Sequence, residues 1–199
     1  MTVHLSDSEI DALRGHQYAL LSSILAAAPD PVRLAAIAAM SGDATALGQA
    51  YAVLARAAAG TDSAAVEREF FELFVGVGRG ELLPYASFYL TGFLNERPLA
   101  DLRADLARLG LERAAGRHEP EDHVAFVFEV MAQLVSGAVP SAAVDEATFF
   151  RRHIQPWAGQ FFDDLAVAPS ARFYRPVAEI GRLWVDIEAR AFALAESSA

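Results

Sequence analysis

The sequence predicts an all-α protein of about eight to ten helices in a single compact domain. Apolar residues recur at helical spacing, and no segment alternates apolar and polar residues as a half-buried strand does. Prolines, glycines and N-capping residues interrupt the chain at intervals typical of helices. Hydrophobic residues make up 54% of the chain, and much of this share is alanine, a strong helix former. No linker divides the chain, so one domain over residues 1–199 is expected.

Boundary residues define the first four helices. Ser6 and Glu9 fit a capping box, in which each side chain accepts a hydrogen bond from the other residue's backbone amide. Asp30 before Pro31 combines an N-cap with a proline at the first helical position. Gly60 ends the third helix, and Thr61 or Asp62 caps the fourth. The expected spans are about 7–28, 31–40, 44–59 and 62–74.

Glycine and proline also mark helix boundaries in the second half of the chain. Gly110 closes one helix in the left-handed conformation that glycine adopts at little cost. Pro120 is expected to start the next helix, with Glu119 as its N-cap. Pro156 should break a later one because it lacks an amide donor. The expected spans are 87–94, 98–109, 120–137, from Ser141 or Asp145 to Pro156, and from Ser170 through Phe192. Pro176 either lies in the early turns of this last helix or marks a later start. A loop at 111–120 is the nearest feature to a hinge.

Composition limits the classes of function. The formal net charge is −10, which argues against nucleic acid or an anionic membrane as the main partner, because both require a positive surface. The chain has no cysteine, so disulfides and thiolate chemistry are excluded. Its first residues lack the basic start and apolar core of a signal peptide. No uninterrupted apolar run approaches the ~20 residues of a membrane span. A cytoplasmic protein without stable membrane insertion is expected.

The segment Glu119-Pro120-Glu121-Asp122-His123 is the main candidate for a polar site. Proline and carboxylates are favoured at a helix N-terminus, so capping alone explains most of it. Capping does not explain His123, because a positively charged imidazole is disfavoured at that end of a helix. Asp122 and His123 point in different directions on a helix, yet both could contact one ligand lying across its end. Structural capping and a ligand or peptide site are both consistent with these residues.

An aromatic segment precedes a flexible loop. Phe70, Leu73 and Phe74 occur at helical spacing, which fits a stripe of the core. Three glycines follow within 76–80, and then Pro84-Tyr85 forms a rigid turn. Apolar walls, a tyrosine hydroxyl and a pliable loop would also suit a groove for a peptide. The glycine spacing does not match the dinucleotide-binding fingerprint and follows a helix instead of a strand.

No catalytic, cofactor or metal site is predicted. The segment 149–157 contains two arginines and a histidine, but a helix with a charged face that ends at Pro156 accounts for them. No arrangement of Ser, His and Asp has the spacing of a nucleophilic site. His118 and His123 are five residues apart with a proline between them, so they do not share a helical face as zinc ligands do.

Several segments occur in a fixed order from Phe70 to Trp157. They are Phe70-x-x-Leu73-Phe74, Gly76-x-Gly78, Leu83-Pro84-Tyr85-x-Ser87-x-Tyr89, Leu102-Arg103 to Gly110-Leu111, Glu119-Pro120-Glu121-Asp122-His123 with Met131, and His153-x-x-Pro156-Trp157. In this order they resemble the TorD/DmsD/NarJ-like family of redox-enzyme maturation chaperones. Each motif alone is weak, but the series is specific. Some family members have tryptophan where this chain has Phe70 and Tyr85, which bears on the choice of cargo.

The resemblance implies an all-helical, non-enzymatic chaperone in the cytoplasm. It would bind the twin-arginine signal peptide of a molybdopterin-dependent oxidoreductase precursor, assist cofactor insertion and delay export until insertion is complete. The implied peptide-binding residues are Phe70, Leu73, Phe74, Pro84, Tyr85, Glu119, Pro120, Glu121, Asp122 and His123. The sequence itself leaves two states open, a monomer and a dimer that exchanges helices across the hinge-like 111–120 loop. The alternative is a helical regulator that binds a ligand or nucleotide, with His123 as the base of a slow hydrolase.

Overall fold

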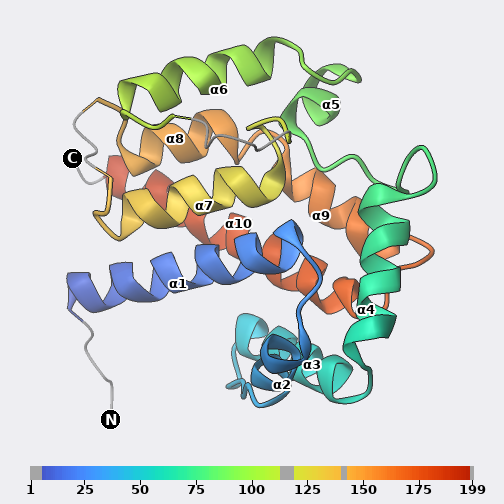
Figure 1. Cartoon of the computed structure of the whole chain (residues 1–199). Helices are drawn as coiled ribbons and strands as arrows, with labels where there is room; N and C mark the ends of the chain where they lie inside the picture. Colours follow the sequence, from blue (N-terminus) through green and yellow to red (C-terminus); the bar gives the residue numbers. More distant parts are fainter. Residues whose placement is uncertain (1–5, 113–118, 140–142, 198–199) are drawn as a thin grey trace. The chain divides into compact units, whose positions relative to one another are not determined.

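The computed structural model describes residues 6–112, 119–139 and 143–197 (Figure 1). Within these residues there are ten α-helices, one π-helical turn and no strand, so the predicted all-α class is confirmed. Two compact units are present, Met1–Ala26 with Tyr85–Pro156 and Ala27–Pro84 with Trp157–Ala199. We call them the first and second units. That the whole chain forms a single domain stays a prediction, and residues 113–118 of the expected hinge loop lie outside the described residues.

The first unit is built around α7. Its helices are α1 (Asp7–Ala26), α5 (Ala86–Thr91), α6 (Arg97–Arg108), α7 (Val124–Val135) and α8 (Glu146–His153). Helix α7 packs lengthwise against α1 and also contacts α8, while α6 contacts α5 and α8 (Figure 1). The rings of Tyr18 and Phe128 lie 5.4 Å apart in the α1–α7 interface and are fully buried. Burial of α7, which is apolar on almost every side, stabilises this unit.

The second unit is built around the long helix α10. Its elements are α2 (Pro31–Ala38), α3 (Ala46–Ala59), α4 (Ser63–Phe70), the π-helical turn η1 (Phe71–Val75), α9 (Ala158–Val167) and α10 (Tyr174–Ser197). Helix α10 packs against α3 and α9, and α2 packs against α3. A β-carbon at Gly181 would lie 2.2 Å from the ring of Phe162. Glycine therefore allows α9 and α10 to approach closely.

Most of the predicted caps are confirmed. The Ser6 amide donates to the Glu9 carboxylate over 2.8 Å, and the Glu9 amide donates to the Ser6 hydroxyl over 3.3 Å. Three aspartates accept hydrogen bonds from backbone amides three residues further on, as N-caps do: Asp30, Asp62 and Asp145. Gly110 follows α6 with a φ of 69°. Helix α8 ends at His153, before Pro156, as expected.

Several expected boundaries are wrong. The short helix expected over 87–94 ends already at Thr91. Helix α7 begins at Val124 instead of Pro120, and His123 is its N-cap in place of Glu119. The cause is tertiary, because the carbonyl of Asp122 accepts from the Ala86 amide over 3.0 Å and holds the preceding residues outside the helix. The fourth α-helix ends at Phe70, and the chain continues as the π-helical turn η1.

The last helix does not start at Ser170 either. It begins at Tyr174, because the side chain of Glu69 accepts hydrogen bonds from the amides at that end. The Ser170 hydroxyl instead donates to the Glu81 carboxylate. Among the described helices, none combines the length and apolar character needed to cross a bilayer.

Candidate functional site

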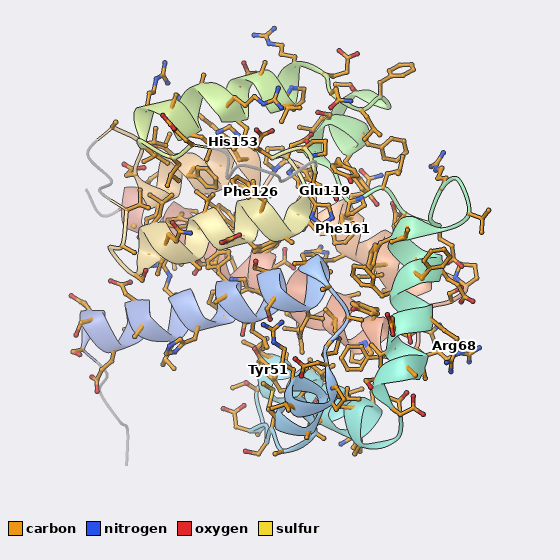
Figure 2. All side chains as sticks on the ribbon, viewed as in Figure 1. Tyr51, Arg68, Glu119, Phe126, His153 and Phe161 are labelled. Atoms are coloured by element: carbon orange, nitrogen blue, oxygen red, sulfur yellow. The ribbon has the colours of Figure 1, made fainter. Side chains whose placement is uncertain are left out.

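Three side chains of the predicted peptide site meet in the first unit. The Tyr85 hydroxyl donates to the Glu119 carboxylate. The rings of Tyr85 and His123 lie 5.2 Å apart, edge to face, and the two residues also form an isolated antiparallel bridge. We call these three residues the Tyr85 cluster. Figure 2 shows Glu119 near the N-terminal end of α7. The Glu119 side chain is exposed, and the two rings are partly exposed, so the cluster faces solvent.

The imidazole of His123 has a defined role at the start of α7. Its Nδ1 accepts a hydrogen bond from the Ala125 amide over 3.1 Å. A nitrogen that accepts carries no proton, so the ring is neutral with its proton on Nε2. A neutral ring suits a helix N-terminus, where positive charge is disfavoured. His123 therefore caps α7, and it contributes an aromatic face to the Tyr85 cluster.

Asp122 is buried and tied to α5. Its Oδ2 accepts from the Ser87 amide over 2.8 Å and from the Ser87 hydroxyl over 2.5 Å. The N-cap of α5, Tyr85, makes no side-chain capping bond, so Asp122 caps that helix from a segment far along the chain. The other oxygen, Oδ1, has no hydrogen-bond partner among the described residues. Asp122 thus fixes the start of α5, next to Tyr85, through one oxygen, while its other oxygen is a buried acceptor without a hydrogen bond among the described residues.

Glu121 is also buried, and its charge is matched. Both Nε and Nη2 of Arg103 donate to one of its carboxylate oxygens, over 3.0 and 2.7 Å. This pair connects the segment before α7 to α6. Of the three carboxylates in the predicted acidic patch, only Glu119 is exposed. Pro120, between the exposed and the buried carboxylates, is partly exposed.

The two predicted phenylalanines lie in the second unit. The rings of Phe70 and Phe74 are 5.1 Å apart, and both contact Tyr174 on α10, at 6.0 and 5.4 Å. Both phenylalanines are partly exposed, whereas Leu73 and Pro84 are buried. Leu73 therefore supports this surface from beneath.

Sequence reasoning missed the exposed apolar residues beside this group. Phe71, Val75 and Val77 lie on and after η1, and Val77 is 97% exposed. Phe71 and Val75 are the exposed ends of η1, in which Leu73 is buried, and Val77 lies in the loop that follows. The sequence motifs assigned other residues of this segment to the site and left these neighbours unassigned.

The predicted residues thus form two groups in different units. Tyr85 and Glu119–His123 belong to the first unit, and Phe70, Leu73, Phe74 and Pro84 belong to the second. Two supporting residues, Ser87 and Arg103, were part of motifs but were not assigned to the site. Their partners lie 35 and 18 residues away, a separation that no local pattern encodes. Within the described residues, no group of three or more His, Asp or Glu side chains is arranged to hold a metal ion, and His118 lies outside them.

Comparison with known proteins places these motifs in a family. The model of the family described as "Nitrate reductase delta subunit" matches residues 41–163, which include every predicted site residue. The chain belongs to this TorD/NarJ family. The membership confirms the resemblance that the sequence motifs indicated.

Named relatives within the TorD/NarJ family are chaperones. "Chaperone protein TorD" of Aliivibrio fischeri is 28% identical over 119 residues, which span 55% of each chain. The Vibrio cholerae protein of the same name is 27% identical over 127 residues, which span 59% of this chain and 58% of that one. The chain thus matches little more than half the length of these curated relatives.

A solved structure supports the fold of this TorD/NarJ family member. A protein of Archaeoglobus fulgidus, described as a redox enzyme maturation protein, matches with a TM-score of 0.56. The match covers 94% of this chain and 96% of the other, at 17% identity. At that identity the likeness shows the fold alone.

Proposed function

We propose that this protein is a cytoplasmic, non-enzymatic chaperone for a molybdopterin-dependent oxidoreductase precursor. It binds the precursor's twin-arginine signal peptide, assists cofactor insertion and delays export until the cofactor is in place. Membership of the TorD/NarJ family and the chaperones among its relatives support this proposal. The finer steps rest on the chemistry of the two groups of residues.

The Tyr85 cluster is the observation that carries the proposal. It presents one exposed carboxylate, Glu119, beside the rings of Tyr85 and His123. A guanidinium group pairs with a carboxylate and also stacks on aromatic faces, so this combination suits an arginine side chain. Because Asp122 fixes the start of α5 through Ser87, the aromatic face is held in place before the ligand arrives.

The second group supplies the apolar contact that the proposal requires. A twin-arginine signal peptide has an apolar stretch after its cationic segment. Phe70 and Phe74 are partly exposed, and Phe71, Val75 and Val77 extend an apolar surface along η1 and the loop after it. Most of the affinity should come from burial of apolar area, whereas the carboxylate sets register and the rate of encounter.

Calorimetry with the signal peptide of a molybdoenzyme from the same genome tests this proposal. We expect saturable binding that weakens as salt rises, because the pair at Glu119 is exposed and screened. Glu119→Gln should weaken binding roughly threefold to tenfold. Glu179→Gln is the matched control, because it removes one exposed carboxylate from α10. Absence of binding to every such signal peptide of the genome would overturn the proposal.

A second pair of variants tests the apolar surface. Phe71→Ser should weaken binding of the signal peptide about tenfold. The variant lacks the exposed aromatic ring whose apolar area would be buried when the peptide binds. Val32→Ser is the control, since Val32 is an exposed apolar residue at the start of α2. Equal affinity of the Phe71→Ser protein and the parent would remove η1 from the proposed site.

A further inference from the structure

A pocket of about 560 Å³ opens in the first unit between α5, α6 and α8. This volume lies within the roughly 300–1,000 Å³ typical of small-molecule sites. Its apolar lining includes Leu90, Pro98 and Leu102, and its polar lining includes Asp105, Arg108 and Arg152. The described residues that line it include none of the ten predicted peptide-site residues. Figure 2 shows His153, which also lines the pocket, on α8 between α6 and α7.

One buried carboxylate organises the polar side of this pocket. Asp105 is 3% exposed and accepts from Nη1 of Arg108 over 2.8 Å and from Nη1 of Arg152 over 3.1 Å. It also accepts from Nε2 of His153 over 2.9 Å. An ionised carboxylate only accepts hydrogen bonds, so His153 carries its proton on Nε2. Asp105 thereby holds two guanidinium groups, one from α6 and one from α8, at the same place.

The local charge is positive although the chain is acidic. Burial lowers the pKa of His153, and the hydrogen bond to Asp105 offsets only part of that effect, so the ring is neutral at pH 7. Burial alone would raise the pKa of Asp105. Hydrogen bonds from His153 and Arg152 outweigh burial, so the pKa of Asp105 lies below its ordinary value and the carboxyl is ionised. The described lining of the pocket carries three guanidinium groups and two carboxylates, those of Arg108, Arg151 and Arg152 and those of Asp101 and Asp105. Positive charge is therefore in excess by one. The surplus stands out in a chain whose net charge is −10.

Both guanidinium groups have donors to offer. The side chains of Arg108 and Arg152 are 59% and 54% exposed, and each contacts Asp105 through Nη1. Arginine has five N–H donors in a planar fork that matches the oxygens of a carboxylate or phosphate. Asp105 already accepts from three side chains, so it is poorly suited to take a cationic ligand as well.

From this geometry we propose that the pocket binds a small organic anion. Its carboxylate or phosphate group lies between Arg108 and Arg152, and its carbon skeleton lies against Leu90 and Leu102. Asp105 is a positioning residue that holds the two guanidinium groups in place. The site is separate from the Tyr85 cluster, so its occupancy can be measured without any peptide.

Nuclear magnetic resonance titration of the full chain with phenyl phosphate, benzoate and inorganic phosphate tests the proposal. Saturable shifts of the side-chain signals of Arg108 and Arg152 are expected with at least one aromatic anion. That anion should bind more tightly than inorganic phosphate, because its ring contacts the apolar lining. Comparison of phenyl phosphate with benzoate shows which head group the site prefers. Benzyl alcohol, which is uncharged, should produce no such shifts.

Variants separate the proposed site from general charge effects. Arg108→Gln and Arg152→Gln should each weaken binding of the aromatic anion about tenfold or more, since each removes a charge-assisted contact. Arg190→Gln, which removes an exposed arginine on α10, should leave the affinity unchanged. The proposal is overturned if no probe gives saturable shifts up to about 10 mM. Unchanged affinity in both arginine variants would overturn it as well.

Discussion

Glu69 in the second unit and Asp122 in the first are both buried carboxylates that cap a helix belonging to a distant segment. Glu69 accepts from the amides of Arg172, Phe173 and Tyr174 at the start of α10, and both of its oxygens are used. Asp122 satisfies Ser87 through Oδ2, while its Oδ1 has no hydrogen-bond partner among the described residues.

The two carboxylates differ in whether both of their oxygens accept a hydrogen bond from the described part of the protein. A buried acceptor without a partner costs free energy, so it is expected where function requires it. Glu69 has its hydrogen-bonding capacity filled by the protein itself. Asp122 lies beside Tyr85 and His123 in the predicted peptide site and has one acceptor left. The comparison therefore predicts that Glu69 affects stability alone and that Asp122 affects stability and binding.

The largest expected effect is on the second unit. Glu69→Gln replaces a charged acceptor of three backbone amides by a neutral group that turns one of its own donors toward them. We expect the free energy of unfolding to fall by about 3 kcal/mol, because hydrogen bonds to a buried charged group are strong. Urea denaturation followed by circular dichroism measures this loss. Glu67→Gln, on the exposed side of α4, should change stability by less than about 0.5 kcal/mol.

A smaller loss of stability is expected at Asp122. Asp122→Asn keeps the size of the side chain and one acceptor for the Ser87 amide, so we expect a loss of about 1–2 kcal/mol. If Oδ1 serves recognition, the variant should also weaken binding of the signal peptide in calorimetry. Ser87→Ala is the matched variant, since it removes the hydroxyl donor and leaves the carboxylate charged. Equal peptide affinity in both variants would make Asp122 as purely structural as Glu69.

The same comparison explains how much of the molecule could be predicted from the sequence. The caps at Asp30, Asp62 and Asp145 were predictable, because each side chain bonds an amide three residues away. The caps from Glu69 and Asp122 were not, because their targets lie 103 to 105 and 35 residues away.

Long-range contacts also explain the errors near the site. The helix after Pro120 was expected to start there on local grounds, but the bond between Ala86 and Asp122 moved its start to Val124. The types of residue in the site were predictable from motifs. Which carboxylate is exposed was not, since Arg103 reaches Glu121 from another helix.

A third buried carboxylate, Asp105, accepts hydrogen bonds from side chains instead of backbone amides. One of these donors, His153, is expected to make the stability of the protein depend on pH. Burial lowers the pKa of His153 below the ordinary value of about 6.5. Below that pH the unfolded chain takes up a proton on His153 more readily than the folded chain, so stability should fall as pH falls. Urea denaturation between about pH 7.5 and about pH 5 tests this direction. His153→Gln should reduce the slope, and an unchanged slope would assign the effect to another group.

The smallest expected effect is at an exposed local cap. Asp30 accepts from the Arg33 amide over 2.8 Å at the start of α2, in contact with solvent. Asp30→Ala should cost about 1 kcal/mol in urea denaturation, since water can replace part of the lost hydrogen bond. Asp30→Asn keeps an acceptor and should recover most of that loss. Glu69 is buried and accepts from three amides, whereas Asp30 is exposed and accepts from one. A cost at Asp30 as large as that at Glu69 would therefore mean that neither burial nor the number of bonded amides sets the strength of these caps.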